Sequence, residues 1–315
     1  MYDRVRASPG TARNTIIHDG RVRMRESNPG VFDLWLPPPP RAPVVFDSPH
    51  SGADYPVDFE AIAPQARLRR AEDMFVAELF EAAPARGAAL LAARFPRSYI
   101  DPNRSEYDID RRLIDGNWPG PVSVTEKSRL GHGLIWRLCP PDLPIYDRKL
   151  TVEEVQARID DYYRPYHRAL ADAIDRARDR FGVVYHLNCH SMPAVSAPMV
   201  VDAADARRRA DFVLGDREGT SCATDFRDLV RGTLEAMGYA VALNDPYKGV
   251  ELISAYSAPV DGRHSLQIEI NRALYMDEER FERTAGFAVL KADIDTLIAT
   301  ICEFAIGGRV AEAAE

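Results

Sequence analysis

Three residues that could carry hydrolytic chemistry, His50, His190 and Glu269, each lie at or just after a strand-like apolar run. Neutral imidazoles bind transition metals, and a free carboxylate can take the proton of a metal-bound water. Taken singly, a loop histidine or a strand glutamate is usually structural. Because ligands bind beyond the carboxyl ends of strands in open α/β sheets, their joint placement predicts a metal-dependent hydrolase with Glu269 as general base.

The run VVYHLNCH (183–190) alternates as a strand does, so its residues divide between two faces. The apolar face holds Val183, Tyr185, Leu187 and Cys189, and the polar face holds His186, Asn188 and His190. Because neighbours in a strand point in opposite directions, His190 is badly placed to act as a base for Cys189. We therefore interpret Cys189 as a small core residue and His190 as a metal ligand. The run LQIEIN (266–271) alternates in the same way and places Glu269 on its polar face.

A metal held by His50 and His190 needs a third ligand. No glutamate stands three residues after His50, which excludes an H-x-x-E pair. Asp73 has helical spacing to the apolar Val76, so it would lie on the inward face of a helix. It could instead lie with Glu72 in the first helical turn, where carboxylates favour the dipole. Asp54 also lies near His50, although it fits a turn equally well. From the spacing alone, Asp73, Glu72 and Asp54 all stay open as the third ligand.

Several cationic side chains in loops could hold an anionic substrate. Arg97 and Arg104 flank a Pro-Asn turn in RSYIDPNRSE, Arg137 ends GLIWR, and Lys248 lies in NDPYKG. Guanidinium groups bind carboxylates through two parallel hydrogen bonds. The same residues could equally form surface ion pairs, and the sequence leaves both readings open.

The elements that must position these residues alternate between strand and helix, which predicts an α/β fold with a mainly parallel sheet. Strands are expected at 44–48, 89–95, 183–190 and 265–272, with another within 199–216. Helices are expected at 67–83, 151–181, 226–238 and 277–304. Thr151 and Glu154 form a capping box at the start of the second helix, and Pro165 marks a kink or break within it.

Composition restricts the function classes. We expect a loosely ordered arm over residues 1–30, one domain over 31–305 and a tail over 306–315. A formal charge of −8 argues against non-specific binding to nucleic acid, and no apolar run is long enough to cross a membrane. The N-terminus lacks the apolar segment of a secretory signal, and the four cysteines form no C-x-x-C pair. These features predict a cytoplasmic protein, and they carry no signal of an oligomeric state.

The motifs of the chain, in their order, resemble the N-formylglutamate amidohydrolase family from about residue 30 to about residue 300. The matching segments are VVFDSPHSG, EDMFVAELF, RFPRSYIDPNRSE, GLIWR, KLTVEEVQARIDDYYRPYH, HLNCHSMP, VLGDREGTSC, NDPYKG and LQIEINRALYMDE. The resemblance implies a zinc-carboxypeptidase-like, or phosphorylase/hydrolase-like, α/β fold with one Zn²⁺ per chain. It also implies removal of formate from N-formyl-L-glutamate, a late step of histidine breakdown.

Carried over by position, the resemblance makes His50 and His190 metal ligands and Glu269 the general base. With it we expect Asp73 of EDMF to be the carboxylate ligand. It implies that Asn103 and Arg104 hold a carboxylate of a small anionic N-acyl amino acid, while Arg137 or Lys248 could hold a second one. Trp136 in GLIWR and Val250 after NDPYKG depart from the family pattern. These departures bear on the substrate more than on the reaction.

Two further functions stay open. The chain could be a deacylase or carboxypeptidase that acts on another N-acyl amino acid or short peptide. It could also be a non-catalytic protein that binds acidic ligands in a basic cleft. Metal content separates these classes, because a hydrolase of this kind should carry about one zinc ion per chain, whereas a binding protein needs none.

Overall fold

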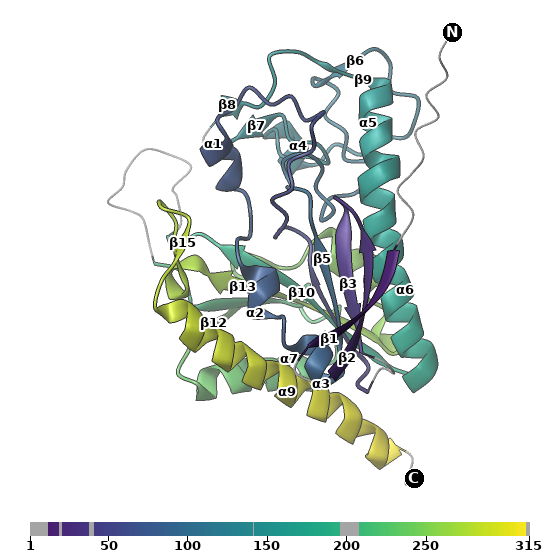
Figure 1. Cartoon of the computed structure of the whole chain (residues 1–315), viewed down its shortest axis with the longest axis vertical. Coiled ribbons are helices and arrows are strands. Elements are labelled where there is room, and N and C mark those ends of the chain that lie inside the picture. The colour runs from purple at the N-terminus through teal and green to yellow at the C-terminus, as the bar shows by residue number, and fades with distance from the viewer. Residues whose placement is uncertain (1–11, 19–20, 38–40, 141, 196–207, 313–315) are drawn as a thin grey trace.

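A nine-stranded sheet runs through the centre of the molecule (Figure 1). The computed structural model describes residues 12–18, 21–37, 41–140, 142–195 and 208–312. In spatial order the strands are β1 (Ala12–His18), β2 (Arg21–Asn28), β3 (Phe32–Leu36), β5 (Ala89–Ala93), β4 (Val44–Ser48), β10 (Val184–Met192), β13 (Arg263–Asn271), β11 (Phe212–Gly215) and β12 (Val241–Leu243). The predicted mixed α/β fold is confirmed.

The four central strands, β5, β4, β10 and β13, are parallel, and antiparallel pairings flank them on both sides. All four therefore end at the same edge of the sheet. His50 follows β4 by two residues, and His190 pairs directly with Glu269 across β10 and β13. The parallel register thus brings the three predicted side chains to one place.

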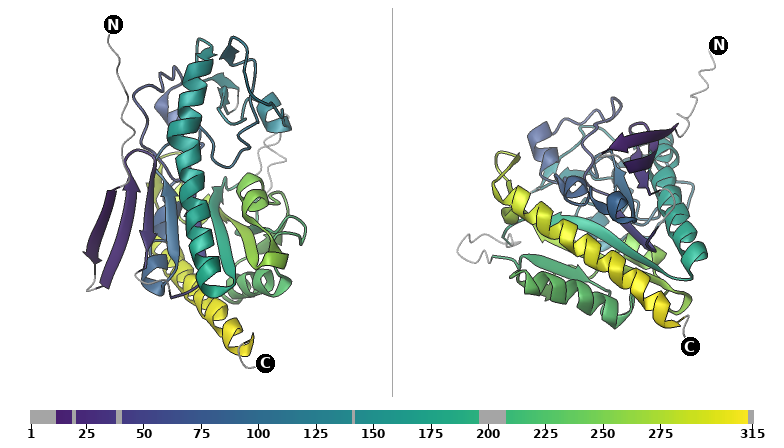
Figure 2. Two further views of the ribbon diagram at one scale, coloured as in Figure 1. Left: turned by 90° about the vertical axis from the view of Figure 1, so that its right-hand side faces the viewer. Right: turned by 60° about the horizontal axis from the view of Figure 1, so that its bottom comes forward.

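Helices lie on both faces of the sheet (Figure 2), and each face carries its own apolar layer. The helix α6 (Arg164–Phe181) packs on one face through Tyr166, Leu170 and Ile174. The other face is covered by α7 (Thr224–Ala236) and α9 (Gly286–Glu312), and Leu187 and Cys189 point into this layer. Cys189 is 0% exposed, as its position on the apolar face of the strand predicts.

The helix expected over residues 67–83 is broken, which corrects the prediction. The chain forms three short helices instead, α1 (Gln65–Arg69), α2 (Val76–Leu79) and α3 (Ala83–Arg86). Phe75 has a φ of 64°, a left-handed conformation that no helix interior accepts. Asp73 therefore lies in the turn between α1 and α2 and not on a helix face.

The long helix expected over 151–181 forms with a change in winding. It comprises α5 (Val152–Arg158), a π-helical turn (Ile159–Tyr163) and α6, in which Pro165 occupies the first turn. The π-helical turn lies just before Pro165, so the predicted kink or break takes the form of a local change in winding. The predicted capping box of Thr151 and Glu154 is confirmed.

The last helix begins nine residues later than expected, at Gly286 instead of residue 277. The Asp277 carboxylate accepts the backbone N–H groups of Glu279 and Arg280, at 2.9 and 3.0 Å, and so forms a turn. That turn connects the strands β14 (Met276–Asp277) and β15 (Glu282–Arg283). A short hairpin thus replaces the first helical turns.

The arm expected over residues 1–30 contains β1 and β2 in its described part, where they extend the sheet beyond β3. The remaining short elements are α4 (Glu126–Arg129), α8 (Glu251–Tyr256), the 3₁₀ turns Pro259–Asp261 and Arg272–Leu274, and the strand pairs β6 (Ile114–Asp115) with β9 (Leu150–Thr151) and β7 (Leu138–Cys139) with β8 (Leu143–Pro144). Among the described residues, no helix is long and apolar enough to span a membrane.

Replacing the N-cap of α5 should destabilise the protein. Thr151→Ala removes the acceptor of the Glu154 N–H, which should lower the free energy of unfolding by about 1 kcal/mol in urea titrations. Thr296→Ala is the control, because this exposed threonine lies inside α9 and alanine favours helix. Equal losses in both variants would contradict a capping role for Thr151.

Candidate active site

His50, His190 and Asp73 meet in a buried cluster with the geometry of a candidate metal site. The Nδ1 atoms of the two imidazoles lie 3.1 Å apart. Asp73 Oδ2 lies 2.9 Å from His190 Nδ1 and 3.4 Å from His50 Nδ1. The three residues are at most 3% exposed. Two imidazoles and one carboxylate match the donor set of catalytic metal sites with three protein ligands.

The residues of this cluster shift one another's pKa values. Burial alone would raise the pKa of Asp73, but hydrogen bonds and charges from His190 and His50 hold the pKa well below its ordinary value. Burial lowers the pKa of His190, against the opposing effect of Asp73. The ionised carboxylate and neutral imidazole that result are the forms that bind metals.

The outer nitrogen of each imidazole is also held. His50 Nε2 lies 2.7 Å from Asp101 Oδ1, and His190 Nε2 lies 2.7 Å from Asn188 Oδ1. The Asn188 amide in turn donates to Asp47 Oδ1 at 2.9 Å. When each Nε2–H donates outward, the Nδ1 lone pair points inward at Asp73 and its partner ring.

Asp47 anchors the longer of these chains. It is fully buried, and its carboxylate also accepts from His186 Nε2 and the Tyr166 hydroxyl, each at 2.8 Å. Burial raises the pKa of Asp47, but the hydrogen bonds outweigh this effect and lower it overall, so the carboxylate is ionised. Ser265 Oγ lies 3.1 Å from His186 Nδ1, which gives a Ser-His-Asp arrangement. Because these residues are closed to solvent, we interpret them as support for Asp47 and not as a nucleophile.

The turn that carries Asp73 is attached to the loop after β4. The Asp73 N–H donates to the His50 carbonyl at 2.9 Å. Ser51 Oγ donates to the Asp73 carbonyl and accepts the Ala77 N–H, each at 3.1 Å. The left-handed Phe75 completes the turn. The third ligand residue is therefore positioned by its contacts with the first one, not by helical periodicity.

The second oxygen of Asp73 has donors of its own. Arg272 Nη2 and Ser191 Oγ each lie 3.2 Å from Asp73 Oδ1. The two alternative ligands have other partners. Glu72 accepts hydrogen bonds from a tyrosine hydroxyl and an arginine, and Asp54 pairs with an arginine at the surface. Among the described residues, Asp73 is the carboxylate that joins the two histidines.

Glu269 lies beside the cluster, on the strand next to His190. It is 7% exposed, and its Oε1 accepts a hydrogen bond of 2.8 Å from Gln267. Burial and the negative charge of Asp73 raise the pKa of Glu269 well above its ordinary value, against the opposing charges of Arg97, Arg272 and Arg209. A buried carboxyl with a raised pKa next to candidate metal ligands is suited to proton transfer.

The loop after β5 brings cationic groups to the β4 side of the cluster. Arg97 donates to Asp101 Oδ2 through two nitrogens, at 2.8 and 3.2 Å, and its guanidinium carbon lies 5.1 Å from the centre of the Trp136 ring. Arg104 donates to two backbone carbonyls and lies 3.9 Å from Asp101 Oδ2. Asp101 thus joins both guanidinium groups to His50 of the candidate metal site.

Asn103 contacts the cluster directly. Its Nδ2 lies 3.1 Å from His190 Nε2, and its Oδ1 accepts the Leu252 N–H at 3.0 Å. Nearby, burial and the charges of Arg104 and Arg97 lower the pKa of His132 to about 4. A neutral imidazole beside two guanidinium groups indicates a positive potential on this side, which suits an anionic ligand.

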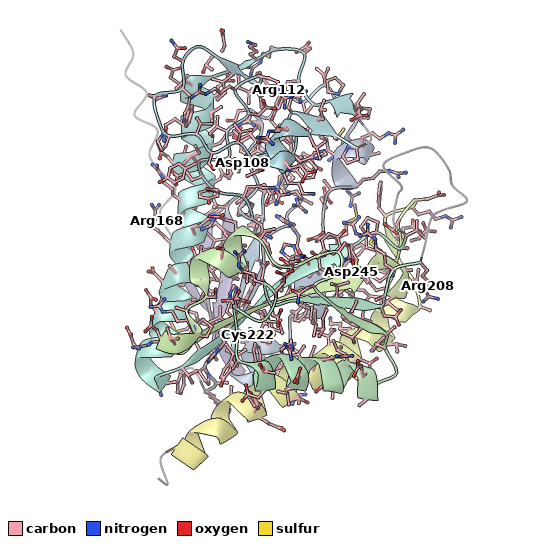
Figure 3. The ribbon with its side chains drawn as sticks, turned by 180° about the vertical axis from the view of Figure 1, so that it is seen from behind. Asp108, Arg112, Arg168, Arg208, Cys222 and Asp245 are labelled. Atoms are coloured by element: carbon pink, nitrogen blue, oxygen red, sulfur yellow. The ribbon has the colours of Figure 1, made fainter. Side chains whose placement is uncertain are left out.

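Arg137 and Lys248 have acidic partners elsewhere. Arg137 Nε donates to Asp110 Oδ2 at 2.9 Å, and Lys248 Nζ pairs with Glu218 at 2.6 Å on the surface. Arg112, which shares Asp110, lies in the loop-rich region beyond the sheet (Figure 3). The structure does not gather these two cations with the triad, and their role in substrate binding stays a prediction.

Sequence reasoning missed the residues that hold the ligands. Asn188 had a usable signal, because it lies two positions before His190 on the polar face of β10. Asp47 ends the apolar run VVFD, and Asp101 opens the DPNRSE segment, but neither position signals a role in the site. Their function depends on contacts between segments far apart in sequence, which no local pattern reveals.

Comparison with known proteins gives consistent matches. Residues 42–276 match the family model described as N-formylglutamate amidohydrolase. Two curated relatives are named N-formylglutamate deformylase. The one from Pseudomonas putida is 28% identical over 76% of this chain and 83% of its own length, and the one from Pseudomonas aeruginosa is 26% identical over 76% and 84%.

Solved structures agree with these matches. A crystal structure of N-formylglutamate amidohydrolase from Ralstonia eutropha JMP134 is 51% identical, with a TM-score of 0.83 over 89% of this chain and 99% of that chain. The gene product Atu2144 from Agrobacterium tumefaciens is 18% identical, with a TM-score of 0.57 over 87% and 92%, and supports the fold alone.

Removing Asp73 should weaken metal binding, whereas removing Asp54 should not. Asp73→Ala deletes the carboxylate between the two imidazoles, while Asp54→Ala deletes a surface ion pair. Divalent-metal affinity measured by competition with a chromophoric chelator should fall only in the first variant. Unchanged affinity in Asp73→Ala would exclude Asp73 as a ligand.

The chain from Asp47 through Asn188 to His190 predicts a rescue. Asp47→Asn removes the charge, and Asn188→Asp places two carboxylates in contact, so each should lower metal affinity about 10- to 100-fold. The double variant moves the charge one position towards His190 and should recover most of that loss.

Asp110→Asn is the matched control, because Asp110 is a buried, ion-paired aspartate outside this chain. It should leave metal affinity unchanged. A double variant that binds metal no better than the weaker single variant would show that Asp47 acts only through general stability.

Proposed function

Because this chain belongs to the N-formylglutamate amidohydrolase family, we propose that it hydrolyses N-formyl-L-glutamate to glutamate and formate. The observation that carries this proposal is the buried cluster of His50, Asp73 and His190 with Glu269 on the adjacent strand. The names of the relatives from Pseudomonas and Ralstonia support the same substrate.

Zn²⁺, one per chain, is the metal that we propose for the cluster. The fit rests on the donors, which are two inward Nδ1 atoms whose rings are fixed at Nε2, and one ionised carboxylate. Three protein ligands of this kind leave a fourth position open, as catalytic zinc sites do. When bound, zinc would supply a Lewis acid that polarises the formyl oxygen and makes a water molecule more acidic.

Glu269 would carry the proton through the reaction. As a carboxylate it takes a proton from the attacking water while the new C–O bond forms at the formyl carbon. It then gives this proton to the amide nitrogen as the C–N bond breaks, which releases formate and the free amine of glutamate. Its burial beside His190 holds it near the reacting atoms and keeps its affinity for protons high.

Arg104 and Asn103 would hold one carboxylate of the substrate. The side chain of Arg104 is 12% exposed and is fixed by backbone carbonyls, so little side-chain freedom is lost on binding. Arg97 shares Asp101 with Arg104, and its contact with Asp101 would keep positive charge near the reacting carbonyl. These groups favour an acidic N-acyl amino acid over a neutral one.

A panel of N-acyl amino acids tests the substrate. N-formyl-L-glutamate should release amine faster than N-acetyl-L-glutamate or N-formyl-L-leucine, and a strong chelator should abolish the reaction. Faster release from a neutral substrate or a peptide would instead indicate a broader deacylase or a carboxypeptidase. Metal-free protein that binds glutamate without turnover would indicate a binding protein.

Replacing the proposed base should separate chemistry from metal binding. Glu269→Gln keeps the shape and hydrogen-bonding capacity of the side chain but cannot accept the proton. The turnover number should fall by at least about 10²-fold, while zinc content stays at the wild-type value.

Glu251→Gln is the control for the loss of a partly buried carboxyl, because burial raises the pKa of Glu251 as well. It should retain most of the wild-type turnover. If Glu269→Gln hydrolysed the substrate at the wild-type rate, Glu269 would not be the base.

A further inference from the structure

Arg209 lies at the same edge of the sheet as the cluster, on the side away from Arg104. It precedes β11, which runs antiparallel to β13, so the start of β11 lies near the end of β13. The side-chain amide of Asn271 donates to the carbonyls of Arg209 and Ala210, at 3.3 and 3.2 Å. Asn271 follows Glu269 by two residues on the same strand face, so this backbone is fixed on the Glu269 side of the sheet.

The guanidinium of Arg209 is held in place but pairs with no carboxylate of the described residues. It donates to the Tyr247 hydroxyl, and its carbon lies 5.3 Å from the centre of the Tyr247 ring. Its Nε is shielded from solvent and has no hydrogen-bond partner among the described residues. Arg208 beside it differs, because its side chain is 75% exposed and pairs with Asp211 at 3.3 Å.

Arg209 interacts electrostatically with both Glu269 and Tyr247. Its positive charge opposes the rise in the pKa of Glu269, and the charge of Glu269, after burial, raises the pKa of Tyr247. Arg97, Arg104 and Arg272 lie near the cluster as well, but each has an aspartate of the site within 4 Å. Within the described parts of the chain, Arg209 forms no such ion pair.

The strand order separates the cations into two sides. Arg97 and Arg104 follow β5, Arg209 precedes β11, and the strands that carry the two histidines and Glu269 lie between them. A substrate with two carboxylates could therefore reach both sides with its amide bond over the metal ligands. An N-acyl amino acid with an uncharged side chain has one carboxylate and would leave one guanidinium without an acceptor.

We propose that Arg209, oriented by Tyr247, binds the substrate carboxylate that Arg104 does not hold, and so selects N-acyl amino acids with two carboxylates. The inference rests on the proposed function and adds a binding residue to it. Arg209 is a specificity residue, and Tyr247 is a positioning residue that acts through it.

Kinetics with three substrates test the inference. For N-formylglutamate, Arg209→Ala should lower kcat/KM about 10- to 100-fold, mainly through KM, because a charge-assisted hydrogen bond is lost. N-formylglutamine and N-formylisoglutamine each lack one carboxylate. The loss should disappear for one of them, which identifies the carboxylate that Arg209 binds. Tyr247→Phe should raise KM by a smaller factor, with the same substrate dependence.

Arg208→Ala is the matched control, because it removes the neighbouring arginine from the surface, where Figure 3 shows it at the side of the molecule. Arg208→Ala should leave kcat/KM unchanged for all three substrates. Equal losses on all three substrates in Arg209→Ala, or the same kinetics as in Arg208→Ala, would overturn the inference.

Calorimetric titration with glutamate separates this inference from the proposed function. If the wild-type protein binds glutamate but does not hydrolyse N-formylglutamate, and Arg209→Ala weakens that binding, the inference stands and the proposed function fails. If the wild-type protein hydrolyses N-formylglutamate and Arg209→Ala changes neither kinetics nor glutamate binding, the inference alone fails. Wild-type protein that neither binds glutamate nor hydrolyses N-formylglutamate would overturn both.

Discussion

Three aspartates buried around two imidazole rings are the constraint on which the rest of the site depends. Asp47, Asp73 and Asp101 are each at most 1% exposed, and an ionised carboxylate without partners would be very unfavourable there. Each is therefore surrounded by donors, and the histidines are among those donors. Because Asp101 fixes one ring directly and Asp47 fixes the other through Asn188, the rings have little freedom to turn. The inward lone pairs follow from that arrangement.

The site shifts the pKa values of two of its carboxyl groups in opposite directions. Asp73 has two imidazole rings, a guanidinium donor and a hydroxyl donor around it, and its pKa falls. Glu269 lies nearby, and burial together with repulsion by the charge of Asp73 raises its pKa. A pair of acidic groups whose pKa values differ in this way can divide the work, with one binding a cation and the other moving a proton.

The loop that carries Asp101 and Arg104 depends on a helix far from it in sequence. Arg158 of α5 is 2% exposed, donates to the Tyr99 carbonyl at 3.1 Å and to the Tyr146 hydroxyl at 2.7 Å, and lies 4.1 Å from the centre of the Tyr99 ring. The buried guanidinium of Arg158 is stabilised by a carbonyl, a hydroxyl and aromatic rings, and it fixes the backbone just before Asp101. The long α5–α6 segment therefore supports both the apolar layer of the sheet and the cationic side of the site (Figure 2).

The sequence by itself determined the parts of this protein that repeat with a regular period. The two-residue alternation in VVYHLNCH and LQIEIN separated Cys189 from His190 and placed Glu269 on the polar face, since a strand leaves each side chain only one of two directions. Tertiary structure alone decided the rest. Asp73 reaches the histidines through a non-helical turn that is tied to His50. Asp101, Asn188 and Arg209 each have a partner from a distant segment, namely His50, Asp47 and Asn271. In such contacts, buried charged groups accept hydrogen bonds from segments that are distant in sequence. The spacing of residues along the chain does not predict them.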